Sequence, residues 1–250
     1  MVAVLINRMK RTAEKYAEKR LAHIKTHLKG YAHAPDAELL HQVRVEIKRL
    51  KALLALLQYH NKKFDAHKAY VPFRDIFRAC YAIREPAVMS ELSKKFAAQK
   101  RKPSGADKAT IKKFQKEIPR YLETVDKKGK KLVKEIKKVS PKTLERYLKR
   151  NKRALEGKLF PSFHARDLHK SRKLVKEIMY LETIAIGRED RDPFFAEIAE
   201  LIGTWHDRVI YIDKLRKNKP KPEEEISMLR AENSKELRTL RRKVKEYYGE

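Results

Sequence analysis

Apolar residues recur at helical spacing along nearly the whole 250-residue chain, and this pattern restricts the fold more than any other feature of the sequence. Only 7 glycines and 10 prolines are present, so few turn residues are available for a many-stranded fold. No segment alternates with a period of two for long enough to predict a strand. The pattern breaks near residues 30–35, 61–65, 103–107, 140–141, 160–163, 187–193 and 218–222. These seven breaks predict an all-α protein of eight helices.

A short pattern on the second predicted helix returns in the second half of the chain. The third helices of the two halves also agree, with Arg84-Glu85 matching His206-Asp207. We interpret the repetition as an internal duplication, which predicts two pseudo-symmetric four-helix bundles, residues 1–139 and residues 140–250. Within the first pattern, His41, Arg44 and Lys48 match His169, Arg172 and Lys176 at an offset of 169 − 41 = 128 residues.

The chain carries a large excess of positive charge, with 62 Lys and Arg against 33 Asp and Glu, or +29. An excess of this size repels itself unless an anionic partner neutralises it, and nucleic acid, anionic lipid or a phosphate polymer would serve. The two halves differ: residues 1–140 hold 35 basic and 14 acidic side chains (35 − 14 = +21), and residues 141–250 hold 27 and 19 (+8). We therefore expect the first half to dominate anion binding.

Four basic or His side chains share one side of the second predicted helix. A helix advances about 100° per residue, so His41, Arg44, Lys48 and Lys51 form a ridge between two apolar strips. Gln42, Glu46 and Arg49 occupy the side left for solvent. The ridge is then expected to line an interior basic groove that an anion enters, because burying unpaired cations is prohibitively costly. In the second copy Met179 replaces Lys51, which removes one groove cation.

Two arginines on the third predicted helix, Arg74 and Arg78, stand one turn apart and could extend this groove. Alternatively, they are surface arginines paired with Asp75 or Glu85, and the sequence does not distinguish the two arrangements. The acids Glu85 and Asp207 are interpreted as structural caps or ion-pair partners.

The segment Leu40–Lys51, with its His41-x-x-Arg44-x-x-x-Lys48 pattern, strongly resembles the signature of the conserved histidine α-helical domain, or CHAD, family. The resemblance covers essentially the whole chain, residues 1–250. It implies a pair of four-helix bundles that enclose a basic central channel binding inorganic polyphosphate. The second-half counterparts are His169-x-x-Arg172-x-x-x-Lys176 and Leu201-Ile-Gly203-x-x-His206-Asp207. The resemblance implies the ligand-facing residues His41, Arg44, Lys48, Lys51, His169, Arg172 and Lys176.

The sequence is compatible with three functions, of which non-enzymatic binding of inorganic polyphosphate is favoured. Lys and Arg suit a linear polyanion that has no bases to read. Nucleic-acid binding is the alternative, but base stacking needs exposed aromatic residues among the basic ones, and most Phe and Tyr residues fall at core spacing. A phosphate-processing enzyme would need a carboxylate cluster or an activated nucleophile, and the ridge contains neither.

No cofactor, metal or membrane partner is expected. His23 and His27 have a spacing that suits zinc, but no third ligand lies nearby in sequence, so a surface pair is the preferred interpretation. The single cysteine, Cys80, excludes a disulfide framework, and neither a secretory signal nor a long apolar run is seen. The expected location is the cytoplasm, where the protein could associate with polyphosphate granules.

Overall fold

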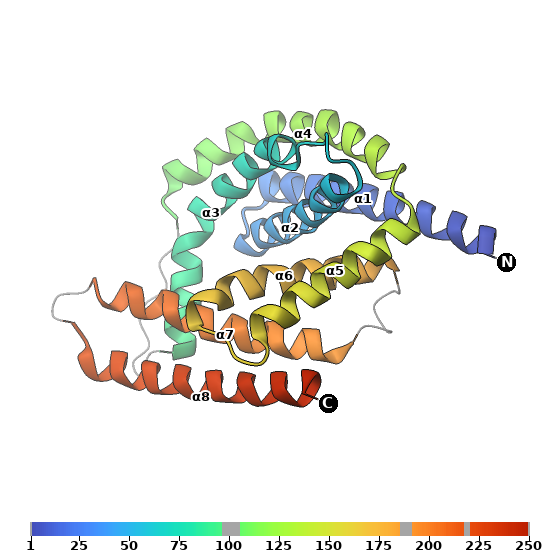
Figure 1. Ribbon diagram of the computed structural model, residues 1–250. Coiled ribbons are helices and arrows are strands. Elements are labelled where there is room, and N and C mark those ends of the chain that lie inside the picture. The colour runs from blue at the N-terminus through green and yellow to red at the C-terminus, as the bar shows by residue number, and fades with distance from the viewer. Residues whose placement is uncertain (1, 97–105, 186–191, 218–220, 250) are drawn as a thin grey trace. The chain divides into compact units, whose positions relative to one another are not determined.

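The computed structural model describes residues 2–96, 106–185, 192–217 and 221–249, with side chains from residue 13 onward except Ala87. Within these ranges the protein is all-α and contains eight helices (Figure 1). The prediction of an all-helical chain is confirmed, and the breaks near residues 103–107, 187–193 and 218–222 fall partly outside the described residues. The helices are α1 (Val2–His33), α2 (Ala37–His60), α3 (Ala66–Phe96), α4 (Lys108–Ile136), α5 (Pro141–Leu159), α6 (Ala165–Ala185), α7 (Pro193–Leu215) and α8 (Glu223–Tyr248).

Short polar side chains begin several of these helices. Asp36 accepts a hydrogen bond of 2.9 Å from the backbone N–H of Glu38 at the start of α2. Asp107 accepts one of 2.8 Å from the backbone of Thr110 at the start of α4. A carboxylate at this position satisfies an N–H group that has no partner inside the helix, so both helix starts follow from local sequence. Pro119 lies inside α4.

The contacts divide the chain into two compact units. Unit 1 contains residues 1–87, 104–148 and 180–187, and unit 2 contains residues 88–103, 149–179 and 188–250. Helices α3, α5 and α6 each contribute residues to both units. The predicted division into two four-helix repeats, residues 1–139 and residues 140–250, is not tested by these units and stays a prediction.

The core of unit 1 is built around α2, which packs with α1 and α4. The main one of the two predicted apolar strips that flank the ridge of α2 is confirmed, since each of its five residues is buried. Gly129 on α4 allows a close approach of α1, because a Cβ atom there would come within 2.9 Å of the Leu21 side chain. The buried stripe residues are Val43, Ile47, Leu50, Leu54 and Leu57.

Unit 2 has its own core, in which α7 and α8 lie side by side (Figure 1). At one end, Leu92 and Phe96 from the last turns of α3 pack with Leu215 of α7 and Ile226 of α8. Elsewhere in the pair, Arg208 of α7 forms 3.0 Å ion pairs with two glutamates of α8, Glu232 and Glu236. Apolar packing and these ion pairs therefore act together to fix α8 on α7.

Candidate functional site

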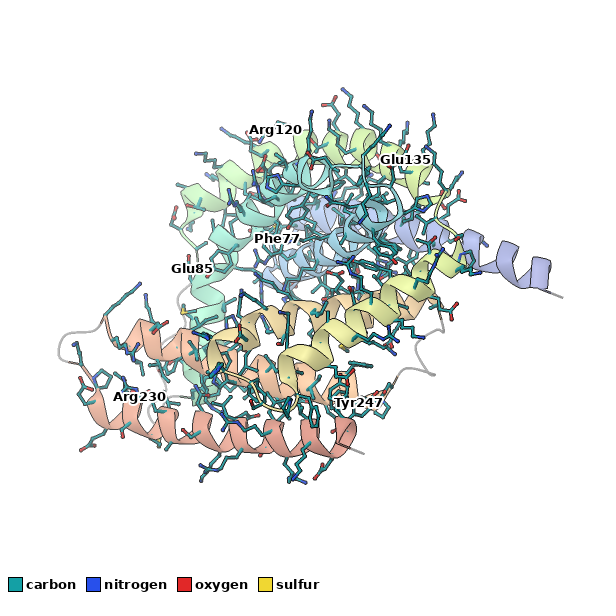
Figure 2. The ribbon with its side chains drawn as sticks, viewed as in Figure 1. Phe77, Glu85, Arg120, Glu135, Arg230 and Tyr247 are labelled. Carbon is teal, nitrogen blue, oxygen red and sulfur yellow. The ribbon has the colours of Figure 1, made fainter. Side chains whose placement is uncertain are left out.

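Arg44 of α2 is held against α3 by three contacts. Its guanidinium carbon lies 3.7 Å from the ring centroid of Phe77, labelled in Figure 2, and 4.8 Å from that of Tyr81. Its Nη1 donates a 2.7 Å hydrogen bond to the carbonyl oxygen of Phe77. An aromatic face attracts a guanidinium, and most strongly where water is excluded. Burial lowers the pKa of Arg44, and the charge of Arg84 also lowers it. Arg44 is thus held in place by α3 and lies near a second cation, Arg84.

Tyr70 of α3 lies near predicted cations of both α2 and α3. Burial raises the pKa of Tyr70, whereas the charges of Arg44, Arg74 and Arg78 lower it. The Nζ atom of Lys51 lies 5.0 Å from the same ring centroid. The structure therefore brings the two predicted arginines of α3 to the ridge of α2. We call this group, His41, Arg44, Lys48, Lys51, Arg74 and Arg78, the α2–α3 cluster.

The open alternative for the α3 arginines, pairing with Asp75 or Glu85, is met for Arg74. Its Nε forms an ion pair with Asp75 Oδ1 at 3.9 Å, which is longer than a hydrogen bond. Within the described residues the same Nε atom is buried without a hydrogen-bond partner. Glu85 is engaged by the hydroxyl of Tyr81, whose pKa is raised by burial and by that carboxylate.

The lysines of the cluster are more open than expected. His41 and Arg44 are half-buried, but Lys48 and Lys51 are exposed. The expectation that the whole ridge is interior is therefore wrong for these two residues. Their long side chains pass along aromatic surface and end in solvent, with Lys48 Nζ 6.0 Å from the Phe77 ring centroid.

The opposite side of α2 is partly buried, whereas the helical phase predicted that it faces solvent. Glu46, expected in solvent, is 2 % exposed. Its Oε1 lies 2.6 Å from Arg49 Nη1, its Oε2 lies 3.2 Å from Arg20 Nη1, and Oε1 also lies 3.5 Å from His23 Nδ1. This side packs on α1, and the buried carboxylate is accommodated because cations from both helices surround it.

Aromatic residues beside the cluster also differ from expectation. Phe77 and Tyr70 are half-buried and Tyr81 is 40 % exposed, so these three residues are not simply core. The sequence does carry a signal for them, because Tyr70, Phe77 and Tyr81 recur at helical spacing among arginines on α3. Since the guanidinium of Arg44 already lies over the rings of Phe77 and Tyr81, these two rings serve first to position a cation.

The second predicted motif converges in unit 2. The ring centroids of His169 on α6 and His206 on α7 are 5.1 Å apart. Burial lowers the pKa of His206, and the charges of Arg172 and His169 lower it further. Burial also lowers the pKa of Lys176, to which Arg172 contributes in the same direction and Glu200 in the opposite one. We call His169, Arg172, Lys176 and His206 the α6–α7 cluster.

The two histidines considered for a metal lie close together, with the rings of His23 and His27 6.0 Å apart. Folding does bring a carboxylate, Glu46, to His23, which sequence spacing could not show, but Arg20 and Arg49 already hold it. In the described residues, no group of three or more His, Cys, Asp or Glu side chains could hold a metal ion. Over the same residues, no helix is both long and apolar enough to cross a membrane.

In a comparison with protein families, the model described as CHAD domain matches residues 15–216. No curated protein and no solved structure matches the chain. The matched region includes both clusters.

Proposed function

The chain belongs to the CHAD family, and we propose that it binds inorganic polyphosphate without chemical turnover, using the α2–α3 and α6–α7 clusters. The internal duplication into two pseudo-symmetric four-helix bundles that enclose a basic central groove is part of this proposal. The ligand-facing residues would be His41, Arg44, Lys48, Lys51, Arg74 and Arg78 in the first cluster, with His169, Arg172 and Lys176 in the second. We add His206 to the ligand-facing residues of the second cluster because its ring lies next to that of His169.

The observation that carries the proposal is the convergence of like charges around Tyr70. Lys51 Nζ lies 5.0 Å from the Tyr70 ring centroid, and the charges of Arg44, Arg74 and Arg78 lower the pKa of the Tyr70 hydroxyl, against the effect of burial. Holding several guanidinium groups near one another costs free energy, which a bound polyanion would recover through charge-assisted hydrogen bonds. Because the cations come from two helices, the folded chain presents them to one ligand.

Nucleic-acid binding is the second candidate, and the exposed ring of Tyr81 is the observation that favours it. Stacking of a base requires an accessible aromatic face. Arg44 lies over the rings of both Phe77 and Tyr81, which disfavours stacking on those faces. A ligand made only of phosphates makes no demand on the rings and suits the cluster better.

Chain length is the first test of the proposed function. Each cluster presents several cations, so a long polyphosphate is expected to bind at least about a hundredfold more tightly than pyrophosphate, which can engage only a few of them. Titration calorimetry at two salt concentrations measures this, with single-stranded DNA and RNA of matched charge as comparison ligands. Equal affinity for pyrophosphate and long chains would contradict an extended site, and tighter binding of RNA would favour the second candidate.

Binding to the α6–α7 cluster is expected to strengthen as the pH falls from about 8 to 5.5. Burial and the charges of Lys173 and Arg172 lower the pKa of His169, and burial, Arg172 and His169 lower that of His206, although Asp207 opposes this. Both imidazoles are therefore neutral in the free protein at neutral pH. A bound polyanion favours their protonated forms, so binding takes up protons. In the absence of ligand the sign is reversed, since the depressed pKa values make folding less favourable as the pH falls below about 6.5.

Calorimetry in buffers of different ionisation enthalpy counts the protons taken up on binding. The double variant H169Q/H206Q is expected to reduce that number, whereas H60Q, which changes an exposed histidine outside both clusters, serves as the matched control. Proton uptake that is the same in H169Q/H206Q and in the unmodified protein would refute the role of this pair.

A further inference from the structure

A cleft of about 570 Å³ in unit 1 is lined by residues that belong to neither cluster, and it has no assigned ligand. It is formed by the end of α2, the connection after it, the first turns of α3 and the last turns of α4, near Glu135 in Figure 2. None of the residues that line it belongs to the α2–α3 cluster. Its volume falls within the range of small-molecule sites.

The floor of the cleft is apolar. Phe64, Ala69 and Pro72 are half-buried there, and Leu54 and Leu132 lie buried beneath the surface. Such a floor favours hydrocarbon, because covering apolar surface removes it from water.

The rim of the cleft is cationic. Its two acids already have partners, since Asp65 accepts a 2.8 Å hydrogen bond from the backbone N–H of Lys68, and Glu135 lies 2.9 Å from Lys138 Nζ. Across the described ranges, none of the five rim lysines forms an ion pair. These exposed lysines are Lys63, Lys68, Lys128, Lys131 and Lys134.

We propose that this cleft binds a single-chain amphiphile with an anionic head, of the class of long-chain carboxylates. The hydrocarbon chain covers the apolar floor and the head lies among the rim lysines. Inorganic polyphosphate has no apolar part and leaves the floor exposed to water, so this ligand differs from that of the proposed function.

Calorimetry with dodecanoate and dodecanol, both below their aggregation concentrations, tests the proposal on the full chain. Dodecanoate is expected to bind at one site at least about tenfold more tightly than dodecanol, since only the carboxylate gains from the lysines. Inorganic phosphate is expected to compete weakly, because it cannot use the floor. Equal binding of the acid and the alcohol, or dodecanoate binding that an equal concentration of inorganic phosphate abolishes, would overturn the proposal.

Two variants locate the site. A69W fills the floor, and K128Q/K131Q removes two rim charges; each is expected to weaken dodecanoate binding about tenfold or more. The control K112Q/K113Q loses the same charge from exposed positions on the same helix and is expected to change binding less than about twofold. An equal loss in the control, or unchanged binding in a folded A69W protein, would contradict the assignment. If A69W does not fold, the comparison of the two lysine pairs still decides the question.

Polyphosphate affinity of the same variants separates this proposal from the proposed function. K128Q/K131Q and K112Q/K113Q are expected to lower it equally, through net charge alone. Failure of dodecanoate binding leaves that result untouched, and failure of polyphosphate binding leaves the amphiphile titration valid.

Discussion

The double substitution R44A/K48A is expected to weaken polyphosphate binding by about 10²- to 10⁴-fold. A charge-assisted hydrogen bond contributes about 1.5 to 3 kcal/mol, and about 1.4 kcal/mol corresponds to a tenfold change in affinity. Arg44 is positioned by Phe77 and Tyr81, so little conformational freedom is lost when an anion binds it. Titration calorimetry at physiological salt provides the measurement.

The control for this substitution is K112A/K113A, which removes two exposed charges from α4. Salt screens such distant charges, so its effect is expected to stay below about tenfold. Arg49, although it is a neighbouring cation on α2, is unsuitable as a control because it neutralises buried Glu46. A loss in K112A/K113A as large as that in R44A/K48A would show that net charge, rather than position, governs binding. Circular dichroism checks that both variants remain helical.

The substitution E46Q is expected to lower the free energy of unfolding by about 3 to 5 kcal/mol, the range found when one member of a buried ion pair is removed. The carboxylate of Glu46 is surrounded by Arg20, Arg49 and His23, and Arg20 is itself buried. Without the carboxylate, the Arg20 guanidinium stays in the interior with no counter-charge. Urea denaturation followed by circular dichroism measures the change.

Two comparisons support this interpretation of E46Q. E123Q removes an exposed carboxylate that pairs with Lys127 one turn away, and little change in stability is expected. The double variant R20M/E46L replaces both buried charges with apolar groups, and we expect it to be more stable than E46Q. An E46Q protein with the same unfolding midpoint as the unmodified protein would contradict the structural role of the pair.

Much of the fold was predictable because it depends on local properties of the sequence. Helical spacing identified the helices, and carboxylates such as Asp36 and Asp107 stand where α2 and α4 begin. Spacing also placed Arg44 and Lys48 on one face of α2, since residues three and four apart on a helix are neighbours. The repeated pattern indicated where a second cluster would form, and folding does bring His169 next to His206.

Tertiary structure alone decided what covers each face. Helical phase shows which residues share a side of α2, but it does not show that α1 packs over Glu46 with Arg20 as a buried partner. In the same way, the side chains that hold Arg44 are Phe77 and Tyr81, 33 residues or more away along the chain. The physical reason is that burial and ion pairing depend on which helices meet, and the helical period within one segment contains no information about its neighbours.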